Sequence, residues 1–241
     1  MQNEKEIRKT IAVTGEGSTD YGTKEFGGAW LWGPVGVYLS RLSEKMNKYA
    51  DLVPIERKEV ESFHLGRSIN ALSGKAIPAR RFYVKAKESG FAYGVYYSDA
   101  DKIPGTRNTS SDAKKCWQQR YDEVAEGLNN DLEHFIPMIS LRMIESWILA
   151  DKEALENVGG TLGYYPDREP EMLWGDEHDP NSNYPKCVLN RVVNSMKKKP
   201  KSFGMPIYVE IAENQKMDVL IERCPVSFKK FFEDYSCVLS M

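Results

Sequence analysis

Four short runs of apolar, β-branched and aromatic residues, separated by segments with helical spacing, constrain the fold of this chain most strongly. The runs cover residues 8–14, 52–55, 91–98 and 135–140. Runs of this length and composition are typical of buried strands. Because strands that alternate with helices form parallel sheets, the sequence predicts an α/β fold with a largely parallel central sheet flanked by helices. Pro137 places the last run at a sheet edge or at a strand end.

Apolar residues at intervals of three and four indicate where the connecting helices lie. The helical segments are residues 35–46, 66–89, 109–130, a helix from Ile144 onward, 185–196 and 207–235. Pro78 is expected to break the second of these segments, and Ser110, Ser111 or Asp112 to cap the third. Between the last strand and the final helices, residues 164–185 are rich in Pro, Gly, Asp and Asn. Long irregular segments of this kind often carry function.

The change of character after residue 158 suggests how the chain is organised. We expect an α/β core over residues 1–158. Residues 159–241 are expected to form a loop and a helical extension that packs on this core, so that the two parts make one structural unit.

Composition narrows the class of protein. The 241 residues carry a net charge of −2, so the overall charge gives no reason to expect nucleic-acid binding. A local basic patch can still steer a charged ligand. The four cysteines contain no CxxC pair, which argues against a zinc site, and a disulfide framework is not expected in a chain of this length. The first residues lack the apolar centre of a signal peptide, and no run approaches the ~20 apolar residues of a membrane span. We therefore expect a cytoplasmic protein with no membrane partner.

Acidic residues follow the first and the third predicted strands. Glu16 and Asp20 come after residues 10–14, and Asp99 and Asp101 come after residues 92–97. Ligand sites of open α/β sheets lie at the carboxyl ends of the strands. If the two strands are neighbours, Glu16, Asp99 and Asp101 converge at one edge and offer the oxygen ligands that Mg2+ requires.

Each acidic residue has a catalytic and an ordinary interpretation. Asp99 and Asp101 are two residues apart on an extended chain, so both can face one ion. Glu16 lies between Gly15 and Gly17, which permit close approach of a phosphate, and it can act as a metal ligand or as an acid–base group. The alternative is an ordinary strand-to-helix turn. Asp20 is either a ligand of a second metal or a cap of the following segment.

Glu145 and Asp151 are candidate metal ligands in the segment after the fourth strand. Six residues on a helix turn ~600°, so both can serve one site only if the helix ends between them. Asp151 could instead cap a helix. Arg142, one turn before Glu145, could pair with it or bind phosphate, and the pairing is the favoured interpretation.

Other polar and aromatic features favour ordinary structural interpretations. The segment around His178 is best explained as a solvated acidic turn, and the basic run at residues 197–201 as a solvated helix end. Trp30 and Trp32 could stack on bases, but packing is the commoner role for such residues.

The ordered set of motifs resembles the Toprim fold, which topoisomerases, primases and OLD-type nucleases share. The matching segments are residues 15–20, 98–101 and 144–151, with weaker matches at residues 185–189 and 224–228. More closely, the chain is similar to bacterial Toprim-like proteins, some of them encoded beside ATPases in phage-defence neighbourhoods. The resemblance covers most of the chain in order, and it departs from many relatives at Asp20, where they carry a second glutamate.

The resemblance implies a Mg2+- or Mn2+-dependent site for phosphodiester chemistry. It places Glu16, Asp99 and Asp101 in the roles of catalytic and metal-binding residues, and it makes Lys186 a candidate for stabilising phosphate charge. The expected function is therefore a metal-dependent nuclease that acts on DNA in preference to RNA, with a role in phage defence beside a partner ATPase. The alternatives are a non-catalytic module that binds nucleic acid or protein, and a phosphatase or nucleotide-processing enzyme. The sequence contains no P-loop motif, so ATP hydrolysis of that kind would need the partner.

Overall fold

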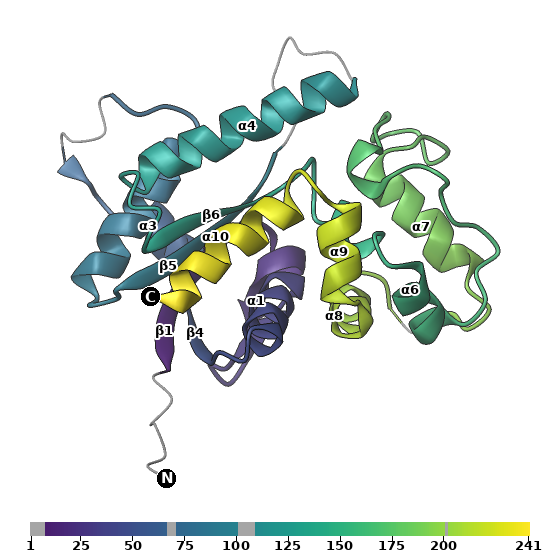
Figure 1. The fold of residues 1–241 in the computed structure, drawn as a ribbon, viewed down its shortest axis with the longest axis horizontal. Coiled ribbons are helices and arrows are strands. Elements are labelled where there is room, and N and C mark those ends of the chain that lie inside the picture. Colours follow the sequence, from purple (N-terminus) through teal and green to yellow (C-terminus); the bar gives the residue numbers. More distant parts are fainter. Residues whose placement is uncertain (1–7, 67–70, 101–108, 201) are drawn as a thin grey trace.

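The centre of the protein is a four-stranded parallel sheet in the order β4-β1-β5-β6, which confirms the predicted α/β fold (Figure 1). The structure is a computed structural model that describes residues 8–66, 71–100, 109–200 and 202–241. The strands are β1 (Lys9–Gly15), β4 (Ala50–Pro54), β5 (Tyr93–Asp99) and β6 (Phe135–Ser140). As expected from Pro137, β6 is an edge strand.

The sheet register brings the carboxyl ends of the middle strands together. β1 and β5 are neighbours, with Gly15 beside Tyr97, and β5 and β6 pair up to Asp99 beside Ser140. The two strands that precede the acidic segments are therefore neighbours, as the expected convergence requires. The residues that follow β1 and β5 lie at the same edge of the sheet.

Helices cover both faces of the sheet because side chains alternate along each strand. Val13, Val95 and Met138 point to the face that is covered by α1 (Pro34–Lys45) and α10 (Phe228–Ser240). Ala12 and Tyr96 point to the opposite face, which α3 (Ala76–Glu88) and α4 (Ser110–Gly127) cover. Figure 1 shows the two layers of helices with the sheet between them.

The apolar cluster under α1 and α10 also includes residues of the later helices. These are α5 (Glu145–Ile148), α6 (Lys152–Gly159), α7 (Pro185–Ser195), α8 (Met205–Asn214) and α9 (Met217–Arg223). At its centre the buried Trp147 ring meets Tyr38 at 5.8 Å and Phe228 at 5.1 Å between ring centroids. Residues from both sides of position 158 thus share one core.

A small hairpin follows β1, and the sequence did not predict it. A single π-helical turn, η1 (Gly17–Tyr21), leads into β2 (Gly22–Lys24), which pairs with β3 (Trp30–Trp32). Trp30 and Trp32 pack on Tyr21 at 4.8 and 5.7 Å between centroids, which agrees with the packing interpretation of the two tryptophans. A Cβ at Gly33 would lie 2.3 Å from the carbonyl oxygen of Asp20, so the chain passes the acidic turn closely only because residue 33 is glycine.

Several predicted helix boundaries differ from the structure. The segment expected to be helical over residues 207–235 is divided among α8, α9 and α10. Thr109 caps α4 by accepting a hydrogen bond from the Asp112 N–H, so none of the three residues expected in that role is the cap. Pro78 does not break α3, because the helix begins at Ala76 and Pro78 lies in its first turn, where a missing N–H costs nothing. The helix after β6 ends at Ile148, and a new helix begins after Asp151.

The remaining elements are short. α2 (Arg57–Glu61) follows β4, and a 3-10 turn, η3 (Pro170–Met172), interrupts the long irregular segment. Within the part of the chain that the structure describes, no helix is both long enough and apolar enough to cross a membrane.

Candidate functional site

A cavity of about 670 Å³ opens at the carboxyl edge of the sheet. Asp20 enters it from the turn after β1, and Asp99 from the end of β5. Glu145 in the first turn of α5 and Lys186 in the first turn of α7 form the opposite wall. The structure therefore brings four of the predicted site residues to one cavity, although they come from four different elements.

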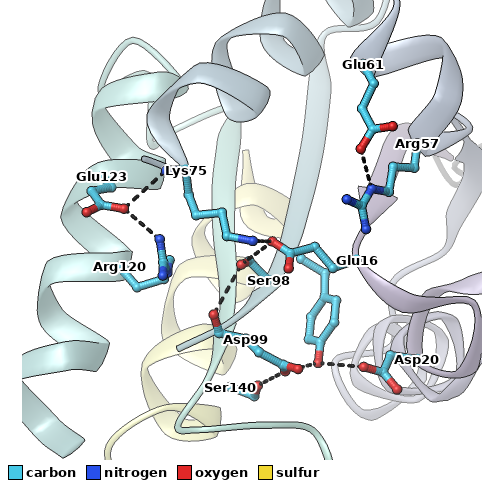
Figure 2. A network of polar contacts seen from close by, with 11 residues as sticks. Glu16, Asp20, Arg57, Glu61, Lys75, Ser98, Asp99, Arg120, Glu123 and Ser140 are labelled. Atoms are coloured by element: carbon cyan, nitrogen blue, oxygen red, sulfur yellow. Dashed lines mark hydrogen bonds and ion pairs between the residues drawn. The ribbon is translucent and has the colours of Figure 1, made fainter. Parts of the chain in front are cut away.

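Asp99 is held in place by two hydroxyl groups. Its Oδ1 accepts hydrogen bonds from Tyr97 OH at 2.5 Å and from Ser140 Oγ at 2.6 Å. The same Tyr97 hydroxyl lies 3.4 Å from Oδ2 of Asp20, so it bridges the two carboxylates (Figure 2). Tyr97 itself is fully buried, so the position of this bridge is set by the core of the protein.

The carboxylates of the cavity repel one another. Burial, and then the charges of Asp99 and Glu145, raise the pKa of Asp20 to about 9. Burial likewise raises the pKa of Glu145, whose Oε1 accepts a hydrogen bond from Tyr208 OH at 2.9 Å. The charge of Lys186 acts in the opposite direction on both acids. Carboxyl groups gathered in this way resist ionising together, and a cation among them would favour their ionised forms.

Glu16 lies beside this cavity and not in its wall. Its carboxylate forms an ion pair with Lys75 and accepts a hydrogen bond from Ser98 Oγ at 2.6 Å. Lys75 comes from the start of α3, and its backbone N–H donates to Glu123 of α4 at 3.2 Å. Figure 2 shows Glu16 and Asp99 on either side of Ser98. The two acids are thus neighbours, but Glu16 already has a cationic partner.

The remaining predicted acids are placed elsewhere or are not described. Oδ1 of Asp151 accepts hydrogen bonds from the N–H groups of Glu153 and Ala154, so this residue caps α6. Its Oδ2 accepts from Lys216 N at 2.8 Å. The buried Asp151 side chain therefore has a structural role and does not line the cavity. Asp101 lies outside the described residues.

The carboxylate oxygens of the cavity can be compared with the ligands that a magnesium ion requires. In residues 8–66, 71–100, 109–200 and 202–241, no group of three or more His, Cys, Asp or Glu side chains is arranged to hold a metal. Mg2+, however, usually binds one or two carboxylates and completes its shell with water and substrate phosphate. Asp20 and Asp99, joined by one hydroxyl, fit that smaller requirement.

Several site residues were not anticipated from the sequence. Tyr97 has the pattern of an ordinary strand residue, and nothing in the sequence indicates that its hydroxyl reaches the site. Ser140 could have been predicted as a site residue, since it is a polar residue at the carboxyl end of a predicted strand. The other wall comes from the later helices and the long loop and includes His178, which is exposed, and Phe203.

Comparison with known proteins shows a similarity to part of a DNA gyrase subunit. A stretch of 140 residues, 58% of this chain, is 29% identical to DNA gyrase B of Chlamydia pneumoniae. That stretch covers 16% of the gyrase polypeptide, so the chain matches a small part of this relative. No family model matches the chain, and no solved structure matches it significantly.

Proposed function

We propose that this protein is a Mg2+- or Mn2+-dependent nuclease of the Toprim type. The observation that carries the proposal is the convergence of Asp20, Asp99, Glu145 and Lys186 on one cavity at the carboxyl edge of a parallel sheet. The similarity to DNA gyrase B supports it, because topoisomerases share the Toprim fold. A DNA substrate is the preferred one for the same reason.

Each residue of the cavity has a role that its surroundings support. Asp99 and Asp20 would hold the ion, with Asp101 and Glu145 as further candidate ligands. A bound divalent ion supplies charge neutralisation at the phosphodiester and lowers the pKa of a bound water. Tyr97 and Ser140 fix the orientation of Asp99, and Tyr208 fixes that of Glu145. Lys186 would contact a phosphate oxygen of the substrate.

Glu16 fits an acid–base role better than a ligand role. Its carboxylate is neutralised by Lys75, which competes with any metal ion for the same oxygens. Ser98 connects Glu16 to Asp99, since Ser98 Oγ donates to Glu16 and is the side chain immediately before Asp99. A carboxylate paired with a lysine in this way can exchange a proton with a water or a leaving group near the cavity. A partner ATPase and a role in phage defence remain proposals that rest on the family resemblance.

A phosphatase or nucleotide-processing enzyme is the second candidate. The volume of about 670 Å³ lies within the range of pockets that enclose small ligands. The same carboxylates and Lys186 would then act on a small phosphorylated molecule.

The test is a cleavage assay on supercoiled plasmid, linear DNA and RNA with Mg2+ or Mn2+. We expect metal-dependent cutting by the wild type and a loss of about 100-fold or more for Asp99→Asn, because a metal contributes several kcal/mol to such a transition state. Asp218→Asn is the matched control, since Asp218 is an exposed acid in α9 that pairs with Lys45 at the surface.

Two results would contradict the nuclease proposal. Turnover of small phosphate esters with intact polymers would favour the second candidate. Nucleic-acid binding that is equal in both proteins, without cutting and without calorimetric metal binding, would instead indicate a binding module.

A further inference from the structure

Arg142 has an unusual backbone conformation at the edge of the site. It follows β6 and precedes α5, and its φ is +68°, in the left-handed region. Large side chains rarely adopt this conformation, which glycine reaches without strain. Strained residues persist where the surrounding structure imposes them, and they concentrate at functional sites. A functional role of the side chain would account for an arginine at this strained position.

The guanidinium group of Arg142 lacks the partners that buried arginines normally have. Its Nε and Nη2 atoms are buried and, among the described residues, have no hydrogen-bond partner. The expected pairing with Glu145 is not found among the described residues, and Glu145 Oε1 accepts a hydrogen bond from Tyr208. In the described part of the chain, the groups that influence Arg142 electrostatically are Cys116, Tyr184 and Asp112, and none of them bonds to Nε or Nη2. Buried donors without acceptors are costly, and they are rare in folded proteins.

The position of Arg142 connects it with the cavity. Ser140, two residues earlier, donates a hydrogen bond to Asp99, and Met143, the next residue, lines the cavity. Tyr184, which influences Arg142 electrostatically, lines the cavity as well. Burial lowers the pKa of Arg142, but a guanidinium remains cationic at neutral pH. Arg142 is thus a cationic residue whose neighbours line the acidic cavity, although it is not itself one of the lining residues.

We propose that Arg142 binds a phosphate oxyanion of the substrate, at a point next to the metal-binding carboxylates. The planar guanidinium offers parallel N–H groups that match two phosphate oxygens, and such charge-assisted bonds are strong. Arg142 is half-buried and its Nη1 is not among the buried unpaired atoms, so a phosphate can approach the guanidinium from that side. The identity of the phosphate as part of a nucleic acid rests on the proposed function, but the oxyanion site itself does not.

The first experiment measures thermal unfolding of the whole protein in EDTA, with and without inorganic phosphate. We expect phosphate to raise the unfolding temperature of the wild type, because a ligand that binds the folded state stabilises it. Arg142→Gly removes the guanidinium and relieves the left-handed strain, so it should fold without loss of stability but respond to phosphate much less than the wild type. Arg142→Asn, which also tolerates this conformation, provides a second variant.

The control for a general charge effect is Arg8→Gln. Arg8 is an exposed arginine at the amino end of β1, on the edge of the sheet opposite to the cavity. Its substitution removes the same charge and should leave the phosphate response unchanged. A wild type that does not respond to phosphate, or an Arg142→Gly variant that responds equally, overturns the inference. So does a large loss of stability in both Arg142 variants, since that result would show a structural arginine.

The second experiment measures binding of a short fluorescent DNA duplex in EDTA at several salt concentrations. We expect Arg142→Asn to weaken binding about ten-fold, in line with the loss of a charge-assisted hydrogen bond. The slope of log affinity against log salt should also become shallower by about 0.9, the value for one phosphate contact. An unchanged slope would overturn the direct contact.

The two proposals can fail separately. If phosphate stabilises the wild type through Arg142 but no nucleic acid is bound or cut, the oxyanion site stands and the nuclease proposal falls. If DNA is cut and Arg142→Asn changes neither its binding nor its cleavage, the nuclease proposal stands and the role of Arg142 falls.

Discussion

At the scale of single residues, the site depends on a hydroxyl that bridges two acids. Tyr97 OH donates to Asp99 and lies close to Asp20, while its ring is locked in the core. The bridge holds the two carboxyl groups at a defined separation, and this is what the proposed pair of metal ligands needs before an ion binds. Residues that orient metal ligands commonly contribute ten-fold or more to metal affinity.

We predict that Tyr97→Phe weakens Mn2+ binding about ten-fold, because Asp99 and Asp20 lose their common partner. The fold should be retained, since the ring still fills its place, and the free energy of unfolding should change by only about 1 kcal/mol. Isothermal titration calorimetry measures the first quantity and urea unfolding the second. Tyr235→Phe is the control, because it removes a buried hydroxyl that bonds to Ser43, away from the cavity. Equal metal affinity in the wild type and Tyr97→Phe would refute the orienting role.

The sequence indicates which acidic residues share a sheet edge, but it does not indicate the partners of their side chains. Asp20 and Asp99 could be found because the ends of parallel strands share an edge. The ion pair between Glu16 and Lys75 could not be found, because it depends on where α3 starts relative to the sheet. Tyr97 was missed because its alternate position along β5 marks it as a core residue, and only its hydroxyl reaches the carboxylates.

At the scale of elements, the break between α5 and α6 decides the role of Asp151. The chain leaves α5 at Ile148, and Asp151 starts α6 with three hydrogen bonds from backbone N–H groups. One of the donors is Lys216, just before α9, so the carboxylate also ties two helices together. The i, i+6 spacing from Glu145 gave no indication of this contact, which is formed across 65 residues of chain.

We predict that Asp151→Ala lowers the free energy of unfolding by about 2 kcal/mol, because a cap is lost and a buried N–H group loses its acceptor. Metal-dependent cleavage per folded molecule should be unchanged. Urea unfolding and the cleavage assay measure the two effects. Asp151→Ser, which keeps a capping oxygen, should lose less stability. A stable Asp151→Ala protein that no longer binds metal would return Asp151 to the candidate ligands.

The elements were predictable where several signals agreed. The bounds of β6 matched the prediction, because its apolar run is long and ends in polar residues. The β2–β3 hairpin was not predicted, since Trp30, Leu31 and Trp32 form a strand of three residues without a clear alternation. Its position depends on the contact of the two tryptophans with Tyr21, which is tertiary and not local.

At the scale of the whole molecule, the C-terminal helix completes the core of the sheet. In α10, Phe231 stacks on Tyr235 at 5.6 Å between centroids and lies in the same apolar cluster as Trp147 and the strands. Lys9 at the start of β1 donates from Nζ to the carbonyl oxygen of Val238 at 2.7 Å, so the first strand and the last helix are in direct contact. Figure 1 shows α10 lying along the sheet, with the C-terminus close to β1.

We predict that Phe231→Ala lowers the free energy of unfolding by about 3–5 kcal/mol, the usual cost of removing a buried phenylalanine. The same unfolding experiment tests whether the two predicted parts, residues 1–158 and 159–241, unfold as one unit. If both parts form one unit, tryptophan fluorescence and far-UV circular dichroism should report the same transition in the wild type and in the variant. Two separate transitions would show that residues 159–241 unfold independently.

The order of the cavity residues along the chain has a consequence for folding during synthesis. Asp20 comes first along the polypeptide, Asp99 and Glu145 come later, and Tyr208 is among the last contributors. At about 5–20 residues per second, a ribosome needs on the order of ten seconds or more to pass from the first of these positions to the last. The complete wall of the cavity is therefore present on a nascent chain only after Tyr208 has been translated, late in synthesis.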